Sequence, residues 1–194
     1  MSQDIDIVPE GWWTLGDADA FYPDDLPDEW RLAYFANQFR AVLVPRSAWQ
    51  ARPAFDFAEW RSDVHTGFRF FFECRPAIDS KTMRIAATAL GPALAAFLPG
   101  PSPSRLRAPL REPVGEPATK PAPETTLASR LLAPDASHEL GLALRCPRRL
   151  NADPRGARAW LNGLAEKPRL VILDRPAASD LEAWGNLVML MGLG

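Results

Sequence analysis

Histidine and cysteine are scarce in this chain of 194 residues, which contains only His65, His138, Cys74 and Cys146. Two cysteines are too few to predict a disulfide-stabilised secreted domain. No His or Cys pair has the spacing of a metal site. The acidic start lacks an apolar signal core, and no apolar run approaches about 18 residues. We therefore expect a cytoplasmic protein with no metal, no cofactor and no membrane partner.

Basic charge is scarce in the first part of the chain. Residues 1–29 hold nine acidic residues and no Lys or Arg, and the net charge of the whole chain is −2. No overall basic field therefore favours nucleic acid, and Arg148-Arg149 is too small a basic pair to form a nucleic-acid footprint. We also find no Gly-rich phosphate loop and no Ser nucleophile elbow. The chain therefore lacks the commonest sequence signatures of nucleotide-binding proteins and of serine hydrolases.

Short apolar runs are the main structural signal, and most of them are continuous rather than alternating. Continuous runs are typical of strands that are covered on both faces, as in parallel sheets. Helical patterns lie between them, such as the i, i+3, i+4, i+7 spacing over 32–39 and the Asp153-Pro154 helix start. The alternation predicts an α/β fold with right-handed crossovers. The expected strands are residues 5–8, 41–44, 68–72, 93–98, 141–144 and 170–173.

A proline-rich segment interrupts this alternation. Residues 99–123 hold eight of the 20 prolines and show no hydrophobic period. We predict one domain whose βα units occupy 1–98 and 125–194, joined by a loop or linker over 99–124. A short helix is expected over 125–132. The linker is either a surface loop or a lid or partner-binding segment, because loops of this length are often functional.

Two neighbouring stretches carry a resemblance to a known family. They are Tyr34-Phe-Ala-Asn-Gln-Phe-Arg-Ala-Val-Leu-Val-Pro45 and Phe68-Arg-Phe-Phe-Phe-Glu-Cys-Arg75. Together they resemble the front of the YecE-like family, TIM barrels of largely undefined function. Shorter matches follow the family's order over most of the chain outside the proline-rich segment: Gly11-Trp12, Tyr22-Pro23, Leu90-Gly91, Leu98-Pro99, Leu140-Gly-Leu-Ala-Leu-Arg-Cys-Pro147 and Arg169-Leu-Val-Ile-Leu-Asp174.

The chain departs from that family at positions that are usually polar. The family's second strand typically carries Glu where this chain has Leu43, and its third strand ends in Lys where this chain has Glu73. Ala143 and Cys146 replace the Glu and His of the fifth strand. Of the positions that the resemblance marks as polar, those that stay in type are Arg145 and Asp174.

The chain is also short for the family's fold, because a closed (β/α)8 barrel usually needs about 250 residues. The resemblance therefore implies an incomplete TIM-barrel-like fold of about six parallel strands with flanking helices. Such a sheet could stay open and curved, close into a smaller barrel, or be completed by a second copy. The uncharged tail over 187–193 should be buried, either within the monomer or in a dimer.

The carboxyl ends of the strands are where barrel-like α/β proteins bind ligands. Guanidinium groups offer bidentate, always-charged donors to phosphate or carboxylate, so arginines gathered there predict a mouth that binds a small anion. The alternative is that these arginines are solvated and pair locally with Glu73 and Asp174. The residues at the strand ends are Arg46, Glu73, Arg75, Arg145, Cys146, Asp174 and Arg175.

Other residue types allow further interpretations. Asp174 follows a very apolar strand, so it could act as a general acid or base or form a salt bridge with Arg145. Cys146 as a nucleophile would need a nearby base, and an ordinary buried thiol is the alternative. Trp12, Trp13 and Trp49 could line a pocket by stacking or pack into the core.

Two functional hypotheses follow. The first is a non-catalytic or degenerate YecE-like protein that acts as a binding or interaction module, associates with itself and keeps an anion site at its mouth. The second is a hydrolase or phosphate-ester enzyme that uses Asp174 and Arg145, with the proline-rich segment as a lid. The enzyme requires a concave pocket where Arg75, Arg145 and Asp174 converge.

Overall fold

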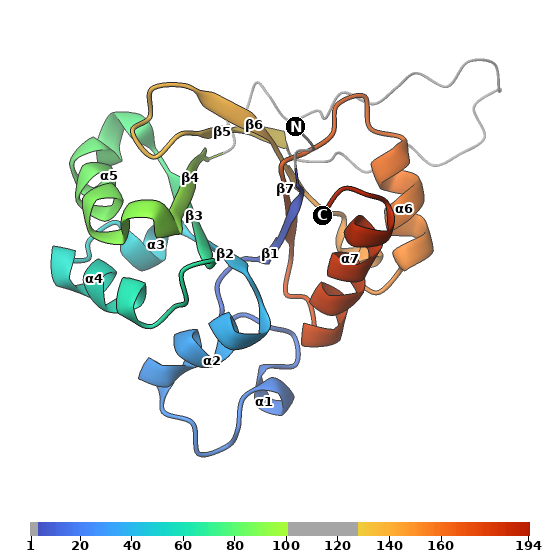
Figure 1. Cartoon of the computed structure of the whole chain (residues 1–194), viewed down its shortest axis with the longest axis horizontal. Coiled ribbons are helices and arrows are strands. Elements are labelled where there is room, and N and C mark those ends of the chain that lie inside the picture. The colour runs from blue at the N-terminus through green and yellow to red at the C-terminus, as the bar shows by residue number, and fades with distance from the viewer. Residues whose placement is uncertain (1–3, 101–127) are drawn as a thin grey trace.

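The computed structural model describes residues 4–100 and 128–194. Its centre is a seven-stranded sheet in the order β1-β7-β6-β5-β4-β3-β2, which curls into a nearly closed barrel (Figure 1). All pairings within the sheet are parallel except those of β5, which is antiparallel to both neighbours. The strands are β1 (Asp6–Pro9), β2 (Ala41–Val44), β3 (Arg69–Cys74), β4 (Leu94–Pro99), β5 (Ala128–Leu132), β6 (Glu139–Arg145) and β7 (Leu170–Leu173).

Helices lie around the outside of the barrel (Figure 1). The α-helices are α1 (Ala18–Phe21), α2 (Arg31–Gln38), α3 (Arg46–Trp49), α4 (Ala54–Ser62), α5 (Pro76–Leu90), α6 (Pro154–Asn162) and α7 (Ala178–Leu190). Short 3-10 turns precede or follow them: η1 (Asp28–Trp30), η2 (Gly91–Ala93) and η3 (Arg148–Leu150). As predicted, Asp153 caps α6, and its carboxylate accepts the backbone N–H of Gly156 at 3.0 Å.

The predicted α/β class with a barrel-like sheet is confirmed. Each of the six apolar runs forms a strand of the parallel set, and a seventh strand, β5, runs antiparallel to them. The prediction of a helix over 125–132 is wrong for its described part, because residues 128–132 form β5. β5 and β6 form an antiparallel hairpin whose turn holds Ala136 at φ 57° and the carboxylate of Asp135 accepting the N–H of Ser137. Most of the predicted linker lies outside the described residues.

The barrel interior is packed with apolar side chains, and every strand contributes to it. Leu43 and Ala143, which stand where the YecE-like resemblance leads one to expect Glu, are among these buried residues. A filled interior of this kind is a core and not a pore. Its members are Val8, Ala41, Leu43, Phe71, Ala96, Leu98, Leu131, Ala143, Leu170 and Ile172.

The barrel has a seam between β1 and β2, the two terminal strands of the sheet. They meet at one bridge between Glu10 and Leu43, where the N–H of Gly11 donates to the carbonyl of Leu43 at 2.7 Å. Gly11 has φ +87°, and a Cβ there would lie 2.9 Å from Cε2 of Trp13. Glycine is therefore required where the seam closes.

The apolar tail over 187–193 is only partly buried within the monomer. Leu187, Val188 and Leu193 are buried, and the N–H of Ile5 donates to the carbonyl of Leu193 at 2.7 Å, so the tail returns to the start of β1. Met189 and Leu190 remain 63% and 87% exposed. Among the described residues, no helix is long and apolar enough to cross a membrane.

Candidate functional site

The mouth of the barrel carries three charged side chains from three strands, which we call the mouth triad. Glu10 follows β1, Glu73 lies in β3 and Arg145 ends β6. The guanidinium of Arg145 donates from Nη1 to Glu10 and from Nη2 to Oε1 of Glu73, the latter at 3.4 Å. All three side chains are partly exposed. The triad therefore sits at the carboxyl ends of the strands, where the sequence predicted a site.

The guanidinium of Arg46 belongs to a different contact, whereas its backbone N–H donates to Oε2 of Glu73 at 3.4 Å. Its Nε and Nη2 atoms donate to the two carboxylate oxygens of Asp79, both at 2.7 Å, in a bidentate pair between α3 and α5. Asp79 also accepts the N–H of Arg75 at 2.7 Å. The hydrogen bonds from Arg46 hold the pKa of Asp79 below its usual range. The guanidinium of Arg46 thus joins two helices.

No ion pair between the described residues joins the remaining predicted residues to the triad. Arg75 precedes α5 and is exposed, and Asp174 and Arg175 follow β7 and are also exposed. The carbonyl of Asp174 accepts a hydrogen bond from Nδ2 of Asn151 at 2.9 Å. Arg145 pairs with two glutamates, and no ion pair between the described residues joins it to Asp174. The structure brings Glu73 and Arg145 together but shows no contact of theirs with Arg75, Asp174 or Arg175.

The two thiols are poor nucleophiles in this fold. Cys74 and Cys146 are both buried and unpaired by disulfide, and burial raises the pKa of each to about 12. A thiol with such a pKa is almost entirely protonated at neutral pH. Within residues 4–100 and 128–194, no group of three or more His, Cys, Asp or Glu side chains could hold a metal ion.

Sequence reasoning missed Glu10. The first strand was expected to end at Val8, and Glu10 lies two residues beyond it. Because side chains alternate along a strand, Val8 in the interior places Glu10 on the same inward side. The signal was an acidic residue two positions beyond an inward-facing valine.

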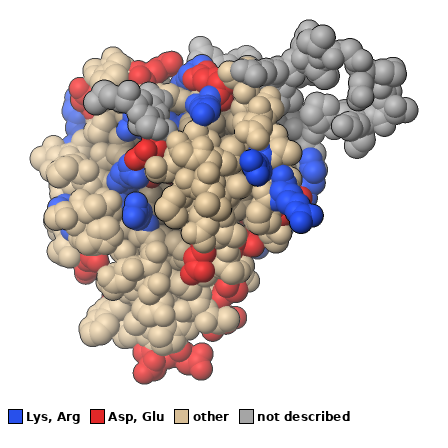
Figure 2. Space-filling view, turned by 45° about the vertical axis from the view of Figure 1, so that its right-hand side comes forward, with Lys and Arg blue, Asp and Glu red and all other residues tan. Residues whose placement is uncertain are grey.

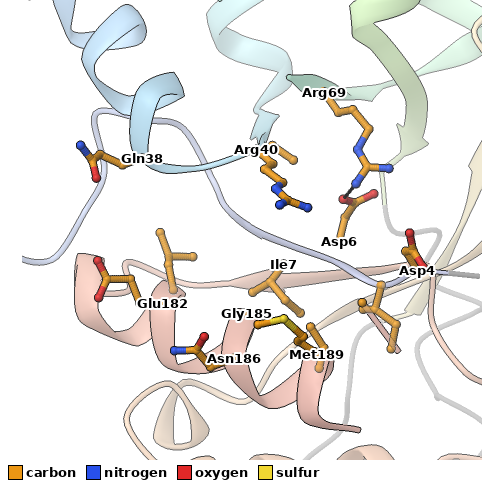
Figure 3. A pocket seen from close by; sticks show the side chains of 15 residues that line it. Asp4, Asp6, Ile7, Gln38, Arg40, Arg69, Glu182, Gly185, Asn186 and Met189 are labelled. Carbon is orange, nitrogen blue, oxygen red and sulfur yellow. Dashed lines mark hydrogen bonds and ion pairs between the residues drawn. The ribbon is translucent and has the colours of Figure 1, made fainter. Parts of the chain in front are cut away.

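A cavity of about 520 Å³ lies at the amino ends of β1 and β2, and none of the triad residues lines it. The carboxylate of Asp6 is buried there, hydrogen-bonded to Nη2 of Arg69, and Arg40 points toward the same carboxylate (Figure 3). Burial raises the pKa of Asp6 to about 6 and outweighs the attraction of Arg69, which lowers it. A carboxyl group with this pKa changes charge near neutral pH.

The curled sheet, its surrounding helices and its charged mouth place this protein in the class of barrel-shaped α/β proteins. Residues 9–105, half of the chain, match the family described as "Protein of unknown function DUF72", so the chain belongs to that family. No curated protein and no solved structure matches the chain significantly.

The raised pKa of Asp6 predicts a specific pH dependence of stability. Between about pH 4 and pH 6 the folded protein binds more protons than the unfolded chain, so the free energy of unfolding falls as pH rises, by roughly 2–3 kcal/mol. This component is absent from Asp6→Asn. Urea unfolding across this pH range should therefore show wild type losing stability relative to the variant. A difference that stays constant with pH contradicts the assignment.

Proposed function

We propose that this chain is a non-catalytic, YecE-like member of its family that binds a small anion at the barrel mouth, at the guanidinium of Arg145. The match of residues 9–105 to the family and the ordered short motifs support the YecE-like assignment. The observation that carries the anion site is the unequal pairing of Arg145. It makes a direct hydrogen bond to Glu10 but contacts Glu73 only at 3.4 Å.

Because the contact between Nη2 of Arg145 and Glu73 is long, a ligand can compete with Glu73 for that edge of the guanidinium. Charge-assisted N–H···O bonds are usually about 2.7–2.9 Å long, so the contact to Glu73 is weak. A ligand carboxylate or phosphate can replace Glu73 on Nη2 while Glu10 keeps Nη1. Arg75 and Arg175, both exposed after strands that end at the same side of the barrel, add positive charge there.

Several features of the described residues support binding over catalysis. Arg46 is held by Asp79, and the thiols of Cys74 and Cys146 are protonated at neutral pH. The interior beneath the mouth is filled by apolar side chains, so a substrate has no deep cavity in which to lose water. A binding protein needs only a shallow site of charged donors.

One observation favours the hydrolase or phosphate-ester alternative. Asp174 is exposed and is followed by Arg175, whose φ of 46° is unusual for a non-glycine residue. Backbone strain of this kind tends to cluster at functional sites. In that alternative Asp174 acts as the general base and Arg145 orients the phosphate.

Titration of the full chain with inorganic phosphate and with succinate, followed by calorimetry, tests the anion site. We expect Arg145→Gln to weaken binding roughly tenfold or more, because it removes a charge-assisted donor. Glu73→Gln should strengthen binding, because it removes the competing charge. Arg130→Gln is the matched control: Arg130 forms a bidentate pair with Glu166 outside the mouth, at 2.5 and 2.7 Å.

Equal affinities in wild type and Arg145→Gln would overturn the anion site. Turnover of a phosphate ester by wild type that is lost in both Asp174→Asn and Arg145→Gln would replace binding with the enzyme alternative. A cytoplasmic location and the absence of a nucleic-acid partner stay predictions.

We also propose that the chain associates with itself through the end of α7. The exposed side chains of Met189 and Leu190 form an apolar patch at the end of α7. Burying this patch in a dimer removes apolar surface from water. Light scattering over a dilution series should give a mass above that of the 21.4 kDa monomer, and Leu190→Glu should shift it toward the monomer. Ile78→Glu, on α5 and similarly exposed, is the control. A monomer at every concentration would contradict the proposal.

A further inference from the structure

Another cavity, distinct from the mouth triad and from the cavity at Asp6, has aromatic walls. It is a cavity of about 370 Å³ between the loop after β1, the η1–α2 region and α4. The rings of Trp12 and Trp13 meet edge to face with centroids 4.5 Å apart, and Trp12 meets Trp60 in the same way at 5.3 Å. Trp12 and Trp60 are buried, whereas Trp13 is 38% exposed. The predicted stacking pocket thus contains Trp12 and Trp13, with Trp60 in place of Trp49.

Uncompensated carboxylates line the same cavity. Glu29, Glu59 and Asp63 contribute to its lining, and none of the three has an ion-pair partner among the residues that the structure describes. Glu59 and Asp63 stand four residues apart at the end of α4, a spacing at which like charges destabilise a helix. Burial raises the pKa of Asp63, and repulsion by Glu59 raises it further. A bound cation would relieve this repulsion.

The chain's own cation at this cavity is already neutralised. The guanidinium of Arg52 lies over the ring of Trp60, 5.0 Å from its centroid. Its Nη1 donates to Asp56 at 2.8 Å and its Nε to the carbonyl of Ala48 at 2.6 Å. Arg52 therefore shows that this aromatic surface accommodates a cation, yet its charge is offset by Asp56. Glu29, Glu59 and Asp63 have no such partner among the described residues and remain available to a ligand.

We propose that this cavity binds the quaternary ammonium group of a small organic cation, with the trimethylammonium head against Trp12 and Trp13 and the carboxylates of Glu29, Glu59 and Asp63 around it. Aromatic faces attract such cations through their quadrupoles, and their methyl groups also bury apolar surface. A divalent metal fits less well, because it needs several converging oxygen ligands, and no such cluster occurs among the described residues.

The wider charge distribution favours the same ligand. In Figure 2 the lower end of the molecule, where Figure 1 places α1 and α2, shows acidic residues, while Lys and Arg lie higher. The first 29 residues supply nine acidic side chains and no basic ones. A field of this sign raises the local concentration of cations near the cavity and speeds their association.

Choline and its neutral carbon isostere, 3,3-dimethylbutan-1-ol, test the proposal directly. Calorimetric titration of the full chain at constant ionic strength should show choline binding at least about tenfold more tightly than the alcohol. The two molecules have nearly the same shape, so the difference between their affinities measures the contribution of the positive charge. Equal affinities, or no heat from choline at tens of millimolar, would overturn the proposal.

Two variants locate the site. Trp13→Ala removes an exposed wall, and Asp63→Asn removes a charge with little change in shape. Each should weaken choline binding about tenfold. Trp30→Ala is the matched control, because Trp30 is 64% exposed and does not line the cavity. Unchanged unfolding transitions show that the variants fold. Wild-type affinity in both Trp13→Ala and Asp63→Asn would contradict the assignment.

Discussion

The hydrogen bond from the N–H of Gly11 to the carbonyl of Leu43 is the constraint on which the rest of this structure depends. It joins the two terminal strands of the sheet and so makes a barrel from an open ribbon. Its neighbours in the sequence serve both candidate sites. Glu10 reaches Arg145 in the mouth triad, while Trp12 and Trp13 form walls of the aromatic cavity. Four consecutive residues thus couple closure of the fold to both places where a ligand is proposed.

Closure with seven strands is possible because the interior is apolar and compact. Leu43 and Ala143 fill positions where charged side chains would need partners or water. Full burial of a leucine contributes about 1.5–3 kcal/mol, whereas an unpaired buried carboxylate would cost more than that. The antiparallel hairpin of β5 and β6 lies between β4 and β7, and the described turn that joins β5 to β6 contains no helix. The mouth triad and the buried Asp6 lie at opposite ends of the strands.

The sequence predicted the strands well where burial on both faces produces a continuous apolar run. It did not predict β5, because Ser129 and Arg130 interrupt the apolar pattern of Ala128–Leu132 and the run is short. The mouth was predicted in part. Strand ends placed Glu73 and Arg145 at one edge of the sheet, but the pairing of Arg46 with Asp79 joins residues 33 positions apart and leaves no local signal. To predict Glu10, one would need to know which side chains of β1 face the barrel interior. An apolar run of four residues does not determine this.

Amide hydrogen exchange of Gly11, followed by NMR, tests the central claim most directly. Gly11 lies outside the regular strands, so its N–H is protected only if the seam between β1 and β2 is closed in solution. We expect this amide to exchange as slowly as those of the barrel strands, such as Phe71 and Ile172. Exchange at the rate of an exposed loop amide would show that the seam is open, and the shared basis of the mouth triad and the aromatic cavity would fail with it.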